Sequence, residues 1–104
     1  MVSSVKSTRL ANRLNLRTKR WETVADLNYE RYHHASCALG AYVYVFCGLS
    51  GPLMLSTNTI EKLDATRPDS RWTLIHVPET ELPPRYGCIA APLNNKEIVI
   101  LGGA

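Results

Sequence analysis

The sequence predicts an all-β fold built from repeated antiparallel units. Two runs of β-branched and aromatic residues, at 42–48 and 97–103, each end in glycine, which is typical of a buried strand that leads into a turn. The two runs lie 55 residues apart, and the two tryptophans, Trp21 and Trp72, lie 51 residues apart. Regular spacings of this size are typical of repeat proteins, in which each repeat is one supersecondary unit stacked on its neighbours.

The overall composition indicates one domain without a membrane span. A chain of 104 residues has the length of a single domain. Its apolar run at 41–48 is far shorter than the roughly 18 residues that indicate a membrane-spanning helix. Three cysteines, Cys37, Cys47 and Cys88, form an odd number without a CxxC pair. We therefore expect free thiols of a reducing compartment and a cytoplasmic location.

Positive charge is concentrated at the N-terminus. The first 21 residues carry six lysines and arginines and no acidic residue, whereas the rest of the chain carries six basic and nine acidic residues. The globular part is therefore slightly acidic, which argues against a nucleic-acid-binding face. We expect residues 1–20 to form a basic leader, either flexible or a short helix capped by Ser7 or Thr8, with Leu10 and Leu14 on one face. An arginine-rich, acid-free leader is also typical of a mitochondrial transit peptide, which is the alternative location.

Trp21 begins the first strand that we expect in the chain, at 21–24. Trp72 has the corresponding place in a strand at 71–77, and each tryptophan is followed three residues later by a β-branched residue. Tryptophans that recur in this way favour packing between repeats over a ligand-binding platform. We therefore expect both rings in the core.

Two hairpins are expected after Arg31-Tyr32 and Arg85-Tyr86, which lie 54 residues apart. Glycine and asparagine tolerate the left-handed backbone of tight hairpins, and Gly40 in the first turn and Asn94-Asn95 in the second provide it. Pro83-Pro84 indicates a loop before the second hairpin. The expected strands are 32–39 with 42–47, and 86–92 with 97–102.

The paired histidines His33-His34 lie at the start of the first hairpin. Adjacent residues of a strand point to opposite faces, so the two side chains cannot bind one metal ion from one strand. The second copy has Gly87-Cys88 at these positions, so the pair is not a repeated feature. We expect half-buried strand histidines.

An irregular loop is expected at 49–57, where Gly51-Pro52 breaks the strand pattern. Its tip, Leu53-Met54-Leu55, is unusually apolar. Either the tip packs on a neighbouring repeat, or it is exposed and binds a partner. A third strand at 58–64, with imperfect alternation, a turn at 67–70 and the fourth strand at 71–77 complete one unit of four antiparallel strands.

The order of these features resembles the kelch repeat over residues 21–103. The resemblance depends on a tryptophan, an Arg-Tyr pair, a leucine before a turn, a hydrophobic strand, paired glycines, Ile-Glu-x-Leu-Asp and a second tryptophan. In this chain these are Trp21, Arg31, Leu39, 42–48, Ile60-Glu61-Lys62-Leu63-Asp64 and Trp72, and the second round is Arg85, Leu93 and 98–103. Cys47 replaces the first glycine of the first pair, and we expect strain there if the position needs a positive φ.

Kelch repeats form the four-stranded blades of β-propellers, so the resemblance implies a kelch-type propeller fragment over residues 21–104. One complete blade is expected at about 31–77, with a partial second blade at about 85–103. A propeller needs about 4–8 blades, so closure requires other blades or other chains.

The resemblance implies a scaffold for protein–protein interaction without enzymatic activity, acting through the loops at 49–57 and 78–84. The first alternative is a truncated piece of a larger propeller with no separate activity. The second is part of an enzyme such as the kelch-like copper oxidases or sugar-acid isomerases. A copper site needs converging ligands, and one strand cannot bring Tyr32, His33, His34 and Cys37 together. We therefore expect no catalytic, cofactor-binding or metal-binding residues, and other proteins as partners rather than nucleic acid or a membrane.

Overall fold

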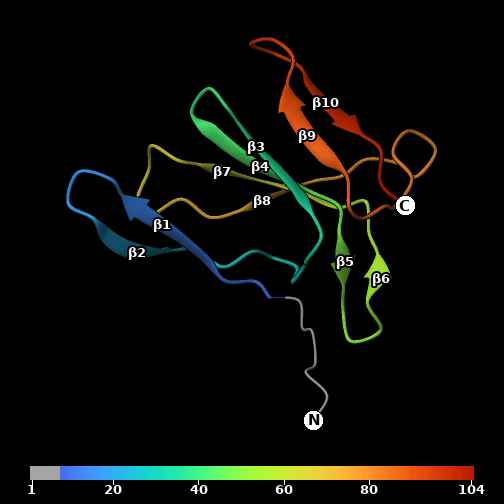
Figure 1. Cartoon of the computed structure of the whole chain (residues 1–104), viewed down its shortest axis with the longest axis horizontal. Helices are drawn as coiled ribbons and strands as arrows, with labels where there is room; N and C mark the ends of the chain where they lie inside the picture. The colour runs from blue at the N-terminus through green and yellow to red at the C-terminus, as the bar shows by residue number, and fades with distance from the viewer. Residues whose placement is uncertain (1–7) are drawn as a thin grey trace.

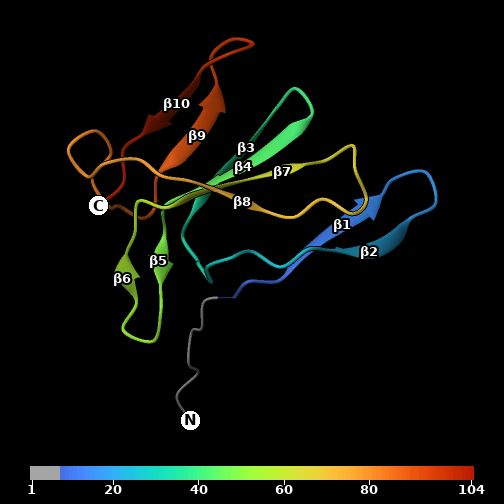
Figure 2. The same cartoon turned by 180° about the vertical axis from the view of Figure 1, so that it is seen from behind.

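The computed structural model describes residues 8–104 and is all-β (Figure 1). Its centre is a four-stranded antiparallel sheet formed, in order, by β3 (Ala35–Leu39), β4 (Tyr42–Phe46), β7 (Ile60–Asp64) and β8 (Thr73–Ile75). Three separate hairpins surround it, and Figure 2 shows them from behind: β1 (Ala11–Asn15) with β2 (Arg20–Val24), β5 (Leu49–Ser50) with β6 (Leu55–Ser56), and β9 (Ile89–Pro92) with β10 (Ile98–Leu101).

The two predicted hairpins are confirmed, with slightly shorter strands. Leu39 pairs with Tyr42 across a turn in which Gly40 has a φ of 60°. In the second hairpin, β9 pairs with β10 from Ile98 opposite Pro92 to Leu101 opposite Ile89. The third and fourth strands of the central sheet are also present, as β7 and β8. No stretch of residues 8–104 forms a helix long and apolar enough to cross a membrane.

The N-terminal leader is not a helix over its described part, because residues 11–15 form β1. This strand pairs with β2 along its whole length, from Ala11 opposite Val24 to Asn15 opposite Arg20. The Asn15 side chain closes the turn by accepting the backbone N–H groups of the second and third residues after it, at 3.0 and 3.2 Å. Backbone pairing thus outweighs the weak helical spacing of the leucines. The remainder of the leader, with the cap expected at Ser7, lies outside the described residues.

The two tryptophans differ in burial, which corrects the prediction that both lie in the core. The Trp72 side chain is buried, and its Nε1 donates to the Ala25 carbonyl at 2.7 Å. Trp21 is 70% exposed. In β2, Val24 packs toward the core of the central sheet, and Trp21, three residues away, points to the opposite face. Burial of Trp72 depends on the segment after β2, and no described segment covers Trp21 in the same way.

Both faces of the central sheet are covered, which explains the nearly continuous apolar run in β4. On one face, Phe46 and Ile60 pack with Cys88 and other residues of the second hairpin. On the other face, Val45 and Leu63 pack with Leu27 and Trp72. A strand that is buried on both faces needs apolar residues at consecutive positions rather than at alternate ones.

The chain also repeats its backbone conformation, because positive φ angles recur at corresponding positions. They are 60° and 101° at Cys47 and Gly48, and 67° and 96° at Gly102 and Gly103. A Cβ atom at Gly48 would lie 2.8 Å from the Tyr32 carbonyl oxygen, and one at Gly103 would lie 2.8 Å from the Tyr86 carbonyl oxygen. Cys47 therefore meets the condition of a positive φ under which strain is expected at this position.

Candidate functional site

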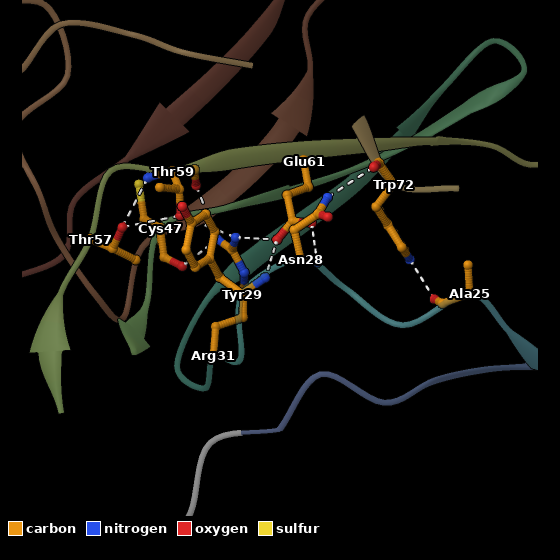
Figure 3. Close-up of polar contacts among 9 residues, drawn as sticks. All are labelled: Ala25, Asn28, Tyr29, Arg31, Cys47, Thr57, Thr59, Glu61 and Trp72. Carbon is orange, nitrogen blue, oxygen red and sulfur yellow. Dashed lines mark hydrogen bonds and ion pairs between the residues drawn. The ribbon is translucent and has the colours of Figure 1, made fainter. Parts of the chain in front are cut away.

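A fully buried ion pair lies at the centre of the candidate site. The side chains of Arg31 and Glu61 both have 0% exposure, and Arg31 Nη2 lies 2.6 Å from Glu61 Oε2 (Figure 3). Glu61 also accepts hydrogen bonds from the Asn28 backbone N–H at 2.6 Å, from Asn28 Nδ2 at 3.0 Å and from the Tyr29 backbone N–H at 3.2 Å. Buried charges need such additional hydrogen bonds, because the attraction within the pair alone does not offset desolvation.

Arg31 joins the end of β4 to the start of β7. Its Nη1 donates to the carbonyls of Cys47 at 2.9 Å and Thr59 at 3.0 Å, and its Nη2 donates to Thr59 Oγ1 at 3.1 Å. The β5–β6 hairpin is the segment between these two points. The buried guanidinium therefore fixes both ends of this hairpin at the edge of the central sheet.

The base of the hairpin is held by further backbone contacts. Tyr32 and Leu49 exchange two backbone hydrogen bonds of 3.1 and 2.8 Å, and the Thr57 N–H donates to the Gly48 carbonyl at 2.9 Å. Gly48 in turn donates its N–H to the Arg85 carbonyl at 2.9 Å, which connects the hairpin to the second repeat. The close approach of the Tyr32 carbonyl explains why position 48 requires glycine.

The segment at 49–57 is a short hairpin and not the irregular loop that the sequence predicts. Its turn is closed by the Met54 N–H, which donates to the Gly51 carbonyl at 3.1 Å, and both residues have positive φ angles. The hairpin projects from the sheet, as Figures 1 and 2 show. Leu53 is 78% exposed and Leu55 is 65% exposed. Of the two alternatives, the tip is therefore exposed and is not packed on a neighbouring repeat of residues 8–104.

The second predicted loop, 78–84, lies beside the base of the hairpin. The Asn58 side chain donates to the carbonyls of Val77 at 2.9 Å and Leu82 at 3.0 Å. Leu82 packs on the core, and its backbone N–H donates to the Pro78 carbonyl at 3.0 Å. The 78–84 loop and the base of the β5–β6 hairpin thus meet at the segment Thr57-Asn58.

The prediction of half-buried strand histidines is wrong, because His33 and His34 precede β3 and both residues are largely exposed. His33 has a φ of 53°, and its carbonyl accepts the Gly87 N–H at 2.8 Å, which connects the two repeats. Its ring lies 4.5 Å from the Tyr32 ring, between centroids. Partial burial and, to a smaller extent, the Arg31 charge lower the pKa of His34. Within residues 8–104, no group of three His, Cys, Asp or Glu side chains is placed to hold a metal ion.

The three cysteines are free thiols. Cys47 and Cys88 are buried in the same core cluster, and Cys37 packs against that cluster from β3. Burial, followed by the neighbouring Cys88, raises the pKa of Cys47 to about 11. The Cys47 thiol is therefore protonated at neutral pH and behaves as a small apolar group.

Sequence reasoning identified Arg31 as a repeated residue but missed its partner Glu61, and it missed Asn28, which donates hydrogen bonds to Glu61. The sequence signal for Glu61 was the imperfect alternation of polar and apolar residues in the third strand. A glutamate at an interior position of a strand needs a cationic partner. No comparable signal identified Asn28. Comparison with protein-family models finds no match, and none of the curated proteins compared with the chain matches it significantly.

Proposed function

We propose that this chain is a non-catalytic scaffold for protein–protein interaction, and that its four-stranded sheet is a kelch-type blade of a β-propeller. Four adjacent antiparallel strands in chain order, interrupted only by the β5–β6 hairpin, with a buried tryptophan beside the fourth support the blade. A second copy of the first two strands, β9 and β10, with the same positive φ pair after it, supports the repeat. The three cysteines are free thiols: Cys37 lies in β3, and Cys47 and Cys88 are buried in the core. Free thiols fit a reducing compartment such as the cytoplasm.

The exposed leucines of the β5–β6 hairpin are the observation that carries the interaction function. Leu53 and Leu55 project from a hairpin whose base is fixed by the buried Arg31. Apolar side chains on a rigid base bind at a low cost in conformational entropy, and loops held on a scaffold are frequent binding elements. The partner is therefore a protein with an apolar pocket or groove that accepts the two leucines.

The test replaces both leucines by serine in the variant L53S/L55S. A partner captured by the wild-type chain is purified, and its affinity for both chains is measured by isothermal titration calorimetry. We expect about tenfold or weaker binding by the variant, because each tenfold loss corresponds to about 1.4 kcal/mol. The control is L93S, since Leu93 is 64% exposed on the turn of another hairpin. Equal affinities of the wild-type chain and L53S/L55S would contradict the proposal.

The second candidate function is that of a structural piece of a larger propeller. The observation that favours it is the pair of two-stranded sheets, β1–β2 and β9–β10, which flank the complete sheet. Each leaves unpaired strand edges, which natural sheets usually cover or protect. Light scattering after size-exclusion chromatography, with circular dichroism, separates the two functions. A folded monomer favours an independent scaffold, and an unfolded or aggregated chain favours the larger propeller.

A further inference from the structure

The β5–β6 hairpin leaves the central sheet at the same end as the segment that follows β8. Ala35 pairs with Phe46, Phe46 with Ile60, and Ile60 with Ile75. The start of β3, the end of β4, the start of β7 and the end of β8 therefore lie together, and both connections project from this end (Figure 1). Described strands precede and follow both connections in the sequence, so their exposure does not depend on where the chain begins or ends.

A short turn after β8 is fixed to the base of the hairpin. The backbone N–H groups of Glu81 and Leu82 both donate to the Pro78 carbonyl at 3.0 Å. The side-chain amide of Asn58, which follows the hairpin, donates to the carbonyls of Val77 and Leu82 at 2.9 and 3.0 Å. Val77 and Leu82 also pack on the core. The turn is therefore held at both ends, next to the anchor of the hairpin.

Residues 78–82, which we call the acidic turn, present two carboxylates beside an uncharged hairpin. Glu79 and Glu81 are both exposed, and neither forms an ion pair within residues 8–104. Residues 48–59, which include the hairpin, contain no charged residue. The exposed leucines and the two carboxylates thus lie on connections from the same end of the sheet.

The basic residues nearest in sequence to the acidic turn do not neutralise it. Arg67 and Arg71 are exposed in the connection from β7 to β8, which lies at the opposite end of the sheet. Arg85, which follows the turn, directs its guanidinium to the carbonyls of Pro83 and Gly102, both at 3.3 Å. The end of the sheet that carries the leucines therefore presents negative charge, which attracts a surface of positive charge.

We propose that the exposed leucines and the acidic turn form one docking surface for a partner protein whose apolar groove is flanked by lysine or arginine residues. This inference rests on the proposed function, which assigns the groove, and it names the charge beside that groove. Leu53 and Leu55 fill the groove, and Glu79 and Glu81 face the cations at its rim. Charges at the rim of an interface mainly raise the rate of association and disfavour partners of like charge.

The test selects binders from a phage-displayed library of a small three-helix protein with randomised surface residues. The library is first depleted on the L53S/L55S chain and then selected on the wild-type chain, so the retained clones need the leucines. We expect the randomised positions of these clones to carry an excess of lysine and arginine over aspartate and glutamate, next to apolar residues.

Surface plasmon resonance then measures the association and dissociation rates of the purified clones. E79Q/E81Q should lower the association rate at low salt by about threefold or more, and it should remove most of the decline of this rate with added salt. D69N/E97Q is the matched control, because it removes two exposed carboxylates elsewhere on the chain. The control should leave both rates close to those of the wild-type chain.

Two results would overturn the inference and leave the proposed function intact. One is a set of retained clones without an excess of basic residues. The other is an association rate that E79Q/E81Q and D69N/E97Q change equally. If no clone survives the depletion and selection, the leucines do not form a binding site, and the proposed function fails together with the inference.

Discussion

Replacing Glu61 by glutamine tests the buried ion pair with almost no change in shape. The substitution removes the negative charge beside Arg31, whose side chain has 0% exposure. It also replaces one of the oxygens that accept hydrogen bonds from Asn28, Tyr29 and Arg31 by an NH₂ group that cannot accept them. The positive charge of Arg31 then stays in the core without a compensating anion.

The expected loss in the free energy of unfolding is about 3–5 kcal/mol, the usual cost of removing one partner of a buried ion pair. The total free energy of unfolding of a domain of this size is about 5–15 kcal/mol, so the variant loses a large part of its stability. Glu22→Gln is the matched control, because Glu22 pairs with Arg13 at 2.7 Å with both side chains about half exposed. We expect a loss below about 1 kcal/mol for this exposed pair.

Urea unfolding, followed by tryptophan fluorescence, measures the stability of both variants. Trp72 reports on the site because it is buried and its carbonyl accepts a hydrogen bond from Asn28. We expect E61Q to lower the urea midpoint far more than E22Q does. A loss for E61Q that is no larger than that for E22Q would refute the view that the buried pair holds the base of the β5–β6 hairpin.

Three further predictions concern backbone strain, packing and pH. C47G should be more stable than C47A by about 1 kcal/mol in the same urea assay, because both remove the thiol and only glycine relieves the positive φ; equal stability would contradict this. G48A should be much less stable than G51A, since a Cβ at Gly48 meets a carbonyl oxygen at 2.8 Å and one at Gly51 meets nothing within 4 Å; the reverse order in thermal unfolding would be inconsistent with the described turn. The lowered pKa of His34 means that the native state binds its proton less readily than the unfolded chain, so its contribution is complete above 6.5 and is lost as the pH falls below that value; H34Q should show a shallower decline in stability on acidification.

The sequence was sufficient to predict the hairpins and the four-stranded unit, because the determinants of these elements are local. The run in β4 and the glycine at position 40 specify a strand and a turn whatever the rest of the chain does. The positive φ at Cys47 was anticipated as a condition for strain, because the second repeat has Gly102 at the same place. These inferences needed only neighbouring residues and the internal repeat.

The remaining features could not be predicted, because they depend on segments far apart in the sequence. Leu10 and Leu14 have a spacing that a helix and a strand can both use, and only pairing with β2 decides in favour of the strand. Trp21 and Trp72 have similar local sequences, and only Trp72 is buried, by the segment at 25–27 together with Val45 and Leu63 of the central sheet. The β5–β6 hairpin was read as a loop because its strands are two residues long.

The contacts of Asn28 have a consequence for the order in which the chain folds during synthesis. Its side-chain amide donates hydrogen bonds to the Glu61 carboxylate, 33 residues later in the sequence, and to the Trp72 carbonyl, 44 residues later. At about 5–20 residues per second, a ribosome needs about 2–9 s to add those 44 residues, whereas a hairpin forms in about 1–10 μs. The β1–β2 hairpin therefore has time to form long before the segment that follows it finds its partners. For those seconds the β1–β2 hairpin and Asn28 lack their contacts with the central sheet.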